Sequence, residues 1–152
     1  EGLNKMRSRE GNFIAADIAK RIDYIDKSLI QIKDKSHDLL IQYKQRLEER
    51  IASLTKGIVE IEPGRIAQEA AFLADKSDIS EEILRAGSHL RQFREISNSE
   101  ESSGRKLNFL LQELNREFNT MGSKTEKAHI SHIVVDVKSE LEKIREQVQN
   151  VE

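Results

Sequence analysis

The sequence contains no cysteine and no tryptophan, and it has a single proline and seven glycines among 152 residues. Without cysteine, the chain forms no disulfide bond and offers no thiolate to a metal ion. The absence of cysteine is compatible with a reducing compartment, and we expect a cytoplasmic protein. With so little proline and glycine and few runs of β-branched residues, the composition is typical of an all-α chain.

Long apolar runs and a charge excess of one sign are also missing. No run approaches the roughly 20 apolar residues of a membrane span, and no signal peptide is recognisable. The net charge is −2 although 34% of the residues are charged. Such a mixed surface carries no global footprint for nucleic acid, so a polyanion would need local basic patches or a cavity formed by assembly. Because the chain begins with Glu-Gly rather than Met, we expect a fragment that lacks the N-terminal part of a longer protein.

Helical periodicity is present along most of the chain. Apolar spacing predicts one helix from Leu3 to about Lys35 and a second from about Leu40 to Lys56. Both helices are charged outside one narrow stripe, which favours an antiparallel hairpin of long arms over 1–61 that makes oligomer contacts. Pro63, suited to a first helical position, marks the boundary to a compact C-terminal bundle of about four helices over 62–152. Within that region, helices are predicted over 65–76, 78–97, 105–124 and 125–149, with a Ser- and Glu-rich loop over 98–104.

The predicted helix over 105–124 has two faces of different chemistry. Its buried stripe consists of Leu107, Leu110, Leu111, Leu114, Phe118 and Met121. About a quarter-turn away runs a row of four neutral amides, the amide ladder: Asn108, Gln112, Asn115 and Asn119. Amides are mediocre helix formers, so a merely solvated face would more readily be built from Glu and Lys. The ladder, with Arg105, Lys106, Arg116 and Lys124 around it, indicates either a surface that hydrogen-bonds a polar partner or a helix–helix contact that sets register.

Glu82 and His89 lie at the edge of an apolar helix face. They are seven residues apart, hence only about 20° apart in phase, and roughly 10 Å apart along the axis, too far to pair directly. Burying a carboxylate and an imidazole costs several kcal/mol unless they are paired, hydrogen-bonded or metal-bound. With Glu69 on the preceding helix, they could hold a divalent cation or act as acid and base. Alternatively, Glu82 pairs with a neighbouring Lys or Arg, and His89 donates to a backbone carbonyl.

Other candidates carry less chemistry. Asp78, with Glu81 three residues later, favours a plain helix N-cap. His129, His132 and Asp136 have a spacing that can hold a transition metal, but they lie outside the apolar stripe and a solvated face is favoured. The sequence has no P-loop, G-x-G-x-x-G, nucleophile elbow or zinc-finger spacing, so familiar hydrolase or kinase motifs are excluded.

Three segments are similar to a known family. RIAQEAAFLADKSDISEEILRAGSHLRQF (65–93), GRKLNFLLQELNREFNTMGSK (104–124) and ELEKIREQVQNVE (140–152) resemble the C-terminal domain of the YicC/YloC family, and the predicted arms resemble its helical middle. These bacterial proteins were called stress-induced and are regarded as endoribonucleases. The family pattern covers Arg65, Glu69, Asp78, Glu82, His89, Arg105, Lys106, Gln112, Glu113, Asn115, Arg116, Glu117, Asn119, Ser123 and Lys124. Asn108 stands where the family usually has Asp, and His129 and His132 have no counterpart.

The resemblance implies a metal-dependent bacterial endoribonuclease that takes part in RNA turnover and works as a ring-like, hexameric homo-oligomer. The implied cofactor is Mn²⁺ or Mg²⁺; no small-molecule cofactor and no membrane partner are expected. Glu69, Glu82 and His89 would supply metal ligands or the general base. The implied RNA-binding residues are Arg65, Arg105, Lys106, Gln112, Asn115, Arg116, Asn119 and Lys124. The alternative is a helical oligomerisation scaffold, with the chemistry mainly in the absent N-terminal domain.

Overall fold

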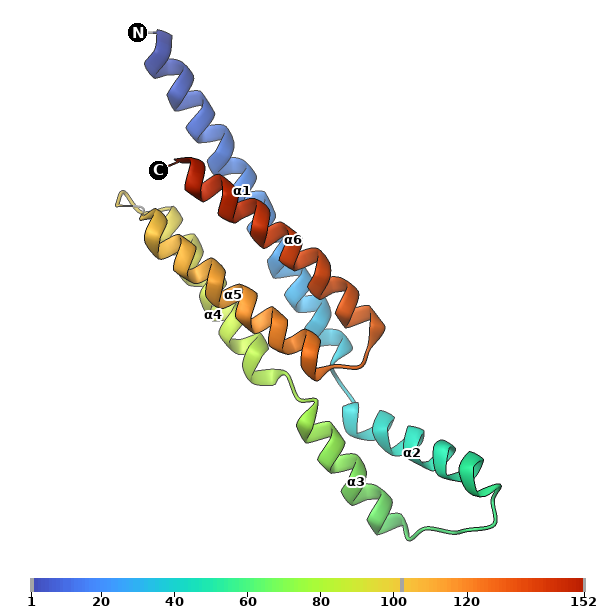
Figure 1. Ribbon diagram of the computed structural model, residues 1–152. Helices are drawn as coiled ribbons and strands as arrows, with labels where there is room; N and C mark the ends of the chain where they lie inside the picture. Colours follow the sequence, from blue (N-terminus) through green and yellow to red (C-terminus); the bar gives the residue numbers. More distant parts are fainter. Residues whose placement is uncertain (1, 102, 152) are drawn as a thin grey trace.

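The computed structural model describes residues 2–101 and 103–151, and the regular structure of these residues is entirely helical (Figure 1). Its helices are α1 (Gly2–Lys35), α2 (Leu39–Thr55), α3 (Pro63–Lys76), α4 (Ser80–Ser97), α5 (Gly104–Lys124) and α6 (Ala128–Val151). The predicted all-α class is confirmed, and the observed helix ends lie within a few residues of those expected from periodicity. No helix of the described residues is both long and apolar enough to cross a bilayer.

Four of the helices form an antiparallel bundle with one continuous core (Figure 1). Helix α5 packs between α4 and α6, and α1 completes the bundle by packing against α4 and α6. The core is filled by side chains at helical spacing on all four helices, among them Ile25, Leu90, Leu114, Phe118 and Val137. The start of α1 and the end of α6 lie at the same end of the bundle, and the hairpin of α2 and α3 projects from the other end.

The pairing of the first two helices differs from the predicted hairpin. Helix α2 packs along α3, whereas α1 belongs to the bundle. The reason lies in the apolar content of each stripe: α1 buries Ile22, Ile25, Leu29 and Ile32, while no side chain of α2 is fully buried. Periodicity shows which face of a helix is apolar but not which helix covers it. The expected boundary between 61 and 62 therefore falls in the loop that joins the two packed helices α2 and α3.

Charged contacts also hold α1 on the bundle. Arg21 donates to Glu140 of α6 at 2.7 Å and to Asp17 of its own helix at 2.9 Å. A further hydrogen bond joins Gln147 Nε2 to Asp17 at 2.6 Å, and this bond and the one from Arg21 lower the pKa of the Asp17 carboxyl. On the other side, Arg94 of α4 contacts two aspartates of α1. Helix α1 is thus fixed to both of its neighbours by polar as well as apolar contacts.

We predict that Ile25→Ala lowers the free energy of unfolding by about 2–4 kcal/mol, because a buried isoleucine truncated to alanine loses transfer free energy and leaves a cavity. Ile30→Ala on the same helix is the matched control, since Ile30 is 55% exposed and Ile25 is 0% exposed. The control should change stability by less than about 0.5 kcal/mol. Urea unfolding followed by circular dichroism measures both variants. Equal effects at the two positions would show that α1 does not pack in the bundle as described.

Candidate metal centre between α4 and α5

Glu82 is buried near the N-terminal end of α4, at 2% exposure. Its Oε1 accepts a hydrogen bond from Lys124 Nζ at 2.7 Å, and Arg85 Nη2 lies 3.7 Å from the same oxygen. Its Oε2 is enclosed and has no hydrogen-bond partner among the described residues. The hydrogen bond to Glu82 raises the pKa of Lys124 above its ordinary value. The carboxylate is therefore paired with a lysine of another helix, as one of the two interpretations of the sequence expected.

His89 meets two carboxylates of α5. One ring nitrogen of His89 and one carboxylate oxygen from each of Glu113 and Glu117 lie within 4.8 Å of one another. Glu117 is buried at 5% exposure, and the other two residues are half-buried. The Nδ1 atom of His89 is enclosed and has no hydrogen-bond partner in the described part of the chain. Imidazole nitrogen and carboxylate oxygen are ligands that Mn²⁺ and similar divalent cations accept. We call His89, Glu113 and Glu117 the ion group.

Arg85 connects Glu82 to the ion group. Its Nε donates to Glu117 Oε1 at 2.9 Å, and its Nη2 lies near Glu82. A weaker contact joins its Nη1 to Glu81 at 3.3 Å, one turn earlier on α4. The bond to Glu117 is the main reason why the pKa of Arg85 is raised further above its ordinary value. A continuous chain of charges, Lys124–Glu82–Arg85–Glu117, thus leads to His89.

The remaining predicted ligand lies elsewhere. Glu69 is exposed on α3 and is not one of the three residues that form the ion group. Asp78 precedes α4, and its carboxyl accepts hydrogen bonds from the Ser80 hydroxyl at 2.5 Å and from the Ser80 backbone nitrogen at 3.0 Å. These two bonds, the first more than the second, lower the pKa of the Asp78 carboxyl. Asp78 therefore stabilises the start of α4, although the residue that caps the helix by backbone geometry is Ile79.

The predicted RNA-binding residues are spread over two helices. Arg65 is exposed on α3; Arg105, Lys106, Gln112, Arg116 and Asn119 are exposed on α5; and Asn115 and Lys124 are half-buried. The amide ladder runs roughly 140–180° around α5 from Glu117, at 100° per residue. It therefore does not border the ion group. Lys106 and Arg116, by contrast, lie within roughly 60° of Glu113 on the same side of the helix.

Sequence reasoning assigned no site role to Glu117, Glu113 or Arg85, although the family pattern covers the two glutamates. Glu117 follows Leu114 by three residues and precedes Met121 by four, so its phase places a carboxylate on the buried stripe. This signal was present in the sequence. Glu113 lies one turn before Glu117, and Arg85 lies one turn before His89. Their roles depend on how α4 faces α5, which no spacing within one helix shows.

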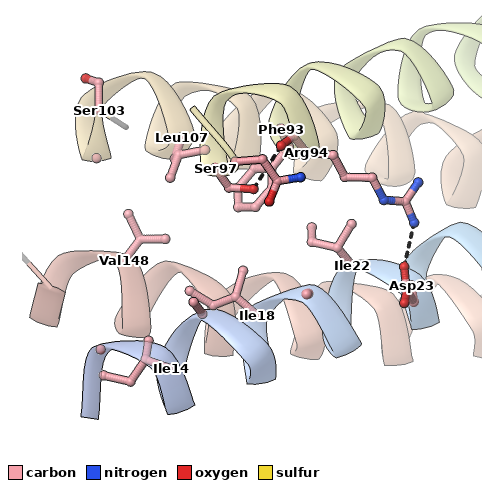
Figure 2. Close-up of a pocket in the computed structure, with 15 residues that line it drawn as sticks. Ile14, Ile18, Ile22, Asp23, Phe93, Arg94, Ser97, Ser103, Leu107 and Val148 are labelled. Atoms are coloured by element: carbon pink, nitrogen blue, oxygen red, sulfur yellow. Dashed lines mark hydrogen bonds and ion pairs between the residues drawn. The ribbon is translucent and has the colours of Figure 1, made fainter. Parts of the chain in front are cut away.

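Two other regions can be compared with this centre. His129, His132 and Asp136 are exposed on α6, as expected for a solvated face. A cavity of about 570 Å³ lies between α1, α4, α5 and α6, with Ile14, Phe93, Leu107 and Val148 among its apolar walls (Figure 2). The charged pair in its lining, Asp23 and Arg94, is closed on itself at 2.7 Å (Figure 2). This cavity shares no residue with the ion group.

Comparison with known proteins is consistent with the resemblance in the sequence. Residues 32–152 match the family described as endoribonuclease YicC-like, C-terminal. The chain is 47% identical over 150 residues to the probable endoribonuclease YicC of Clostridioides difficile (strain 630), covering 99% of this chain and 51% of that protein. It is 35% identical over 147 residues to the probable endoribonuclease YicC of Haemophilus influenzae (strain ATCC 51907 / DSM 11121 / KW20 / Rd), covering 97% of this chain and 50% of that protein. The chain spans about half the length of these curated relatives. Because the family match includes the whole of α2 to α5, with the ion group and Arg85, this chain belongs to the family of YicC-like endoribonuclease C-terminal domains.

Proposed function

We propose that this chain is part of a metal-dependent endoribonuclease and that His89, Glu113 and Glu117 hold a divalent cation, Mn²⁺ or Mg²⁺. The observation that carries the proposal is the convergence of an imidazole and two carboxylates within 4.8 Å at the α4–α5 contact. The relatives, named probable endoribonucleases, supply the reaction class. RNA is the substrate that this name implies.

The residues of the ion group fit such a cation. Ligand atoms around Mg²⁺ or Mn²⁺ are about 3 Å apart when the bonds are about 2.1 Å long. The three candidate ligand atoms lie within 4.8 Å of one another, so their side chains would have to draw together to hold the ion. Half-buried Glu113 can do so by rotation of its side chain, and the enclosed Nδ1 of His89 is free of other hydrogen bonds to described residues. A bound cation polarises a phosphate oxygen and lowers the pKa of a bound water.

Side chains beside Glu113 suit an RNA strand. Lys106 and Arg116 are exposed on the same side of α5 and can neutralise phosphates. Phe109, one turn before Glu113, is 58% exposed, and an exposed aromatic ring beside basic residues is a surface on which unpaired bases stack. Arg105, Gln112 and Asn119 lie further round the helix, where they could contact a longer strand. We therefore place the RNA path along the outer face of α5.

The roles first expected of Glu82 and Glu69 change in this proposal. Glu82 lies outside the ion group and helps to position it, because Glu82 pairs with Lys124 and lies next to Arg85, which contacts Glu117. As a buried, lysine-paired carboxylate, it is a positioning residue rather than a general base. Glu69 is exposed on α3 and contributes no ligand to the ion group, so it would act only if assembly brought another copy's α3 to the centre.

Titration with Mn²⁺, followed by the electron paramagnetic resonance signal of the free ion, tests the metal centre. We expect one site per chain in the wild-type protein. His89→Gln should weaken Mn²⁺ binding at least tenfold, because a ligand is lost. His132→Gln, an exposed histidine on α6, is the matched control and should bind as the wild type does. Unchanged binding by the His89 variant would refute the proposed ligand set.

A helical scaffold is a second candidate function, favoured by the exposed apolar side chains of the α2–α3 hairpin. The hairpin and its loop expose Leu40, Ile41, Leu54, Ile58, Val59 and Phe72 at 50–83%. Such a surface suits a contact with further copies of the chain, and we propose a homo-oligomer, a hexamer in the whole protein. In sedimentation velocity experiments, the Ile41→Ser and Leu54→Ser variants should dissociate into smaller species than the wild-type oligomer. An oligomer that neither binds Mn²⁺ nor cleaves RNA would favour the scaffold.

A further inference from the structure

When no metal ion is bound, the buried carboxylate of Glu117 needs a positive charge beside it, and Arg85 supplies that charge. The Glu117 side chain is only 7% exposed, and Arg85 Nε is the sole cationic group paired with it among the described residues. A buried carboxylate without a counter-charge is strongly unfavourable, and a guanidinium in a protein does not give up its proton. Arg85 therefore neutralises Glu117 in the cation-free protein.

A divalent cation in the ion group makes this arrangement unfavourable. The ion brings two positive charges to Glu117, within a few ångströms of a guanidinium that already carries one, and like charges at such a distance repel. The carboxylate also no longer needs Arg85 as its counter-charge. Metal and guanidinium thus compete for the same buried group.

Arg85 has an alternative partner on the solvent side. Its side chain is 48% exposed, and its Nη1 contacts Glu81, whose side chain is 83% exposed, at 3.3 Å. An exposed ion pair one turn apart on a helix contributes little to stability, so a stronger anion can replace Glu81. The planar fork of a guanidinium matches two oxygens of a phosphate group.

We infer that Arg85 couples the two ligands of this centre: it competes with the divalent cation for Glu117 until an RNA phosphate draws the guanidinium away. The inference rests on the proposed function and extends it, because it assigns an order to the contacts at the site. Metal binding then strengthens RNA binding and RNA binding strengthens metal binding by the same factor, as linkage requires.

The experiment is an Mn²⁺ titration with and without a short single-stranded oligoribonucleotide made resistant to cleavage by 2′-O-methyl and phosphorothioate groups. In the wild-type protein, the RNA should lower the Kd for Mn²⁺ by about fivefold or more, a typical coupling. In Arg85→Gln, Mn²⁺ should bind more tightly than in the wild type without RNA, and the effect of RNA should disappear. Arg91→Gln, at an exposed arginine of the same helix, should retain the wild-type coupling.

A folding defect is distinguished by two further measurements. Thermal melting by circular dichroism shows whether the Arg85→Gln protein is folded at the titration temperature. Arg85→Lys retains the charge but not the fork, so it should keep part of the competition with Mn²⁺ and lose most of the coupling. A merely structural arginine would lower the melting temperature without changing Mn²⁺ and RNA binding in opposite directions.

The outcomes separate this inference from the proposal beneath it. If Mn²⁺ binds to the wild type but coupling persists undiminished in Arg85→Gln, Arg85 is not the link, and the metal centre still stands. If Arg85→Gln weakens Mn²⁺ binding, Arg85 orients Glu117 instead of competing for it, and the inference is overturned. If the wild type binds no Mn²⁺, the proposed metal centre fails and the inference fails with it.

Discussion

Replacing Glu113 by glutamine is expected to lower RNA cleavage by on the order of a hundredfold to a thousandfold, equivalent to a loss of about 3–4 kcal/mol of transition-state stabilisation. The amide keeps the size of the side chain but removes the negative charge that a divalent cation needs. Among the described residues, Glu113 has no ion-pair partner, so the substitution should leave the fold intact. Single-turnover cleavage of a labelled single-stranded RNA at saturating Mg²⁺ or Mn²⁺ measures the effect.

Glu95→Gln provides the control for this prediction. Glu95 is also a glutamate on a bundle helix, but it is exposed on α4 and does not belong to the ion group. The Glu95→Gln variant should cleave RNA at the wild-type rate. Chelation of the metal with EDTA should abolish cleavage by the wild type and by the Glu95→Gln variant. Wild-type cleavage by the folded Glu113 variant would remove this residue from the reaction.

Replacing half-buried Lys124 by methionine is expected to lower the free energy of unfolding by about 2–4 kcal/mol. The substitution leaves the carboxylate of Glu82 buried at 2% exposure with only the longer contact to Arg85, 3.7 Å away. Removing one partner of a buried ion pair lowers the stability of the fold by more than the intact pair adds to it, because the remaining charge is left buried without a counter-charge. Denaturant unfolding, followed by circular dichroism, provides the measurement.

The double variant Lys124→Met, Glu82→Leu tests the cause of that loss. With both charges replaced by apolar groups, most of the lost stability should return, because no uncompensated charge is left in the core. A double variant no more stable than Lys124→Met alone would show that the pair does not account for the loss. The same protein also tests Glu82 as a positioning residue, since a general base could not be replaced by leucine without abolishing cleavage.

Part of the candidate site was visible in the sequence, because Glu82 and His89 lie at the edge of an apolar helix face. The phase of Glu82 on α4 predicted that its carboxylate is paired, hydrogen-bonded or metal-bound, and in the structure it is paired with Lys124. The phase of His89 predicted partial burial, and the structure has it half-buried. Helix phase could not show which side chains face His89, because Glu113 and Glu117 lie on α5, across the contact between α4 and α5. Glu69 was chosen as a third ligand from proximity along the chain, and chain proximity is a poor guide between helices.

The sequence by itself determined the helices and their apolar faces, because helix formation and side-chain phase depend on residues within a turn or two of one another. The stripe from Leu107 to Met121 is one example, and the burial of Ile25 and Ile32 on α1 is another. Only the tertiary structure decided that α1 joins α4, α5 and α6 while α2 packs on α3. It also decided that His89 faces two glutamates beside Arg85. The physical reason is that packing minimises the exposed apolar surface and the unpaired charge of all the helices together. The apolar stripe of one helix therefore does not specify which helix covers it.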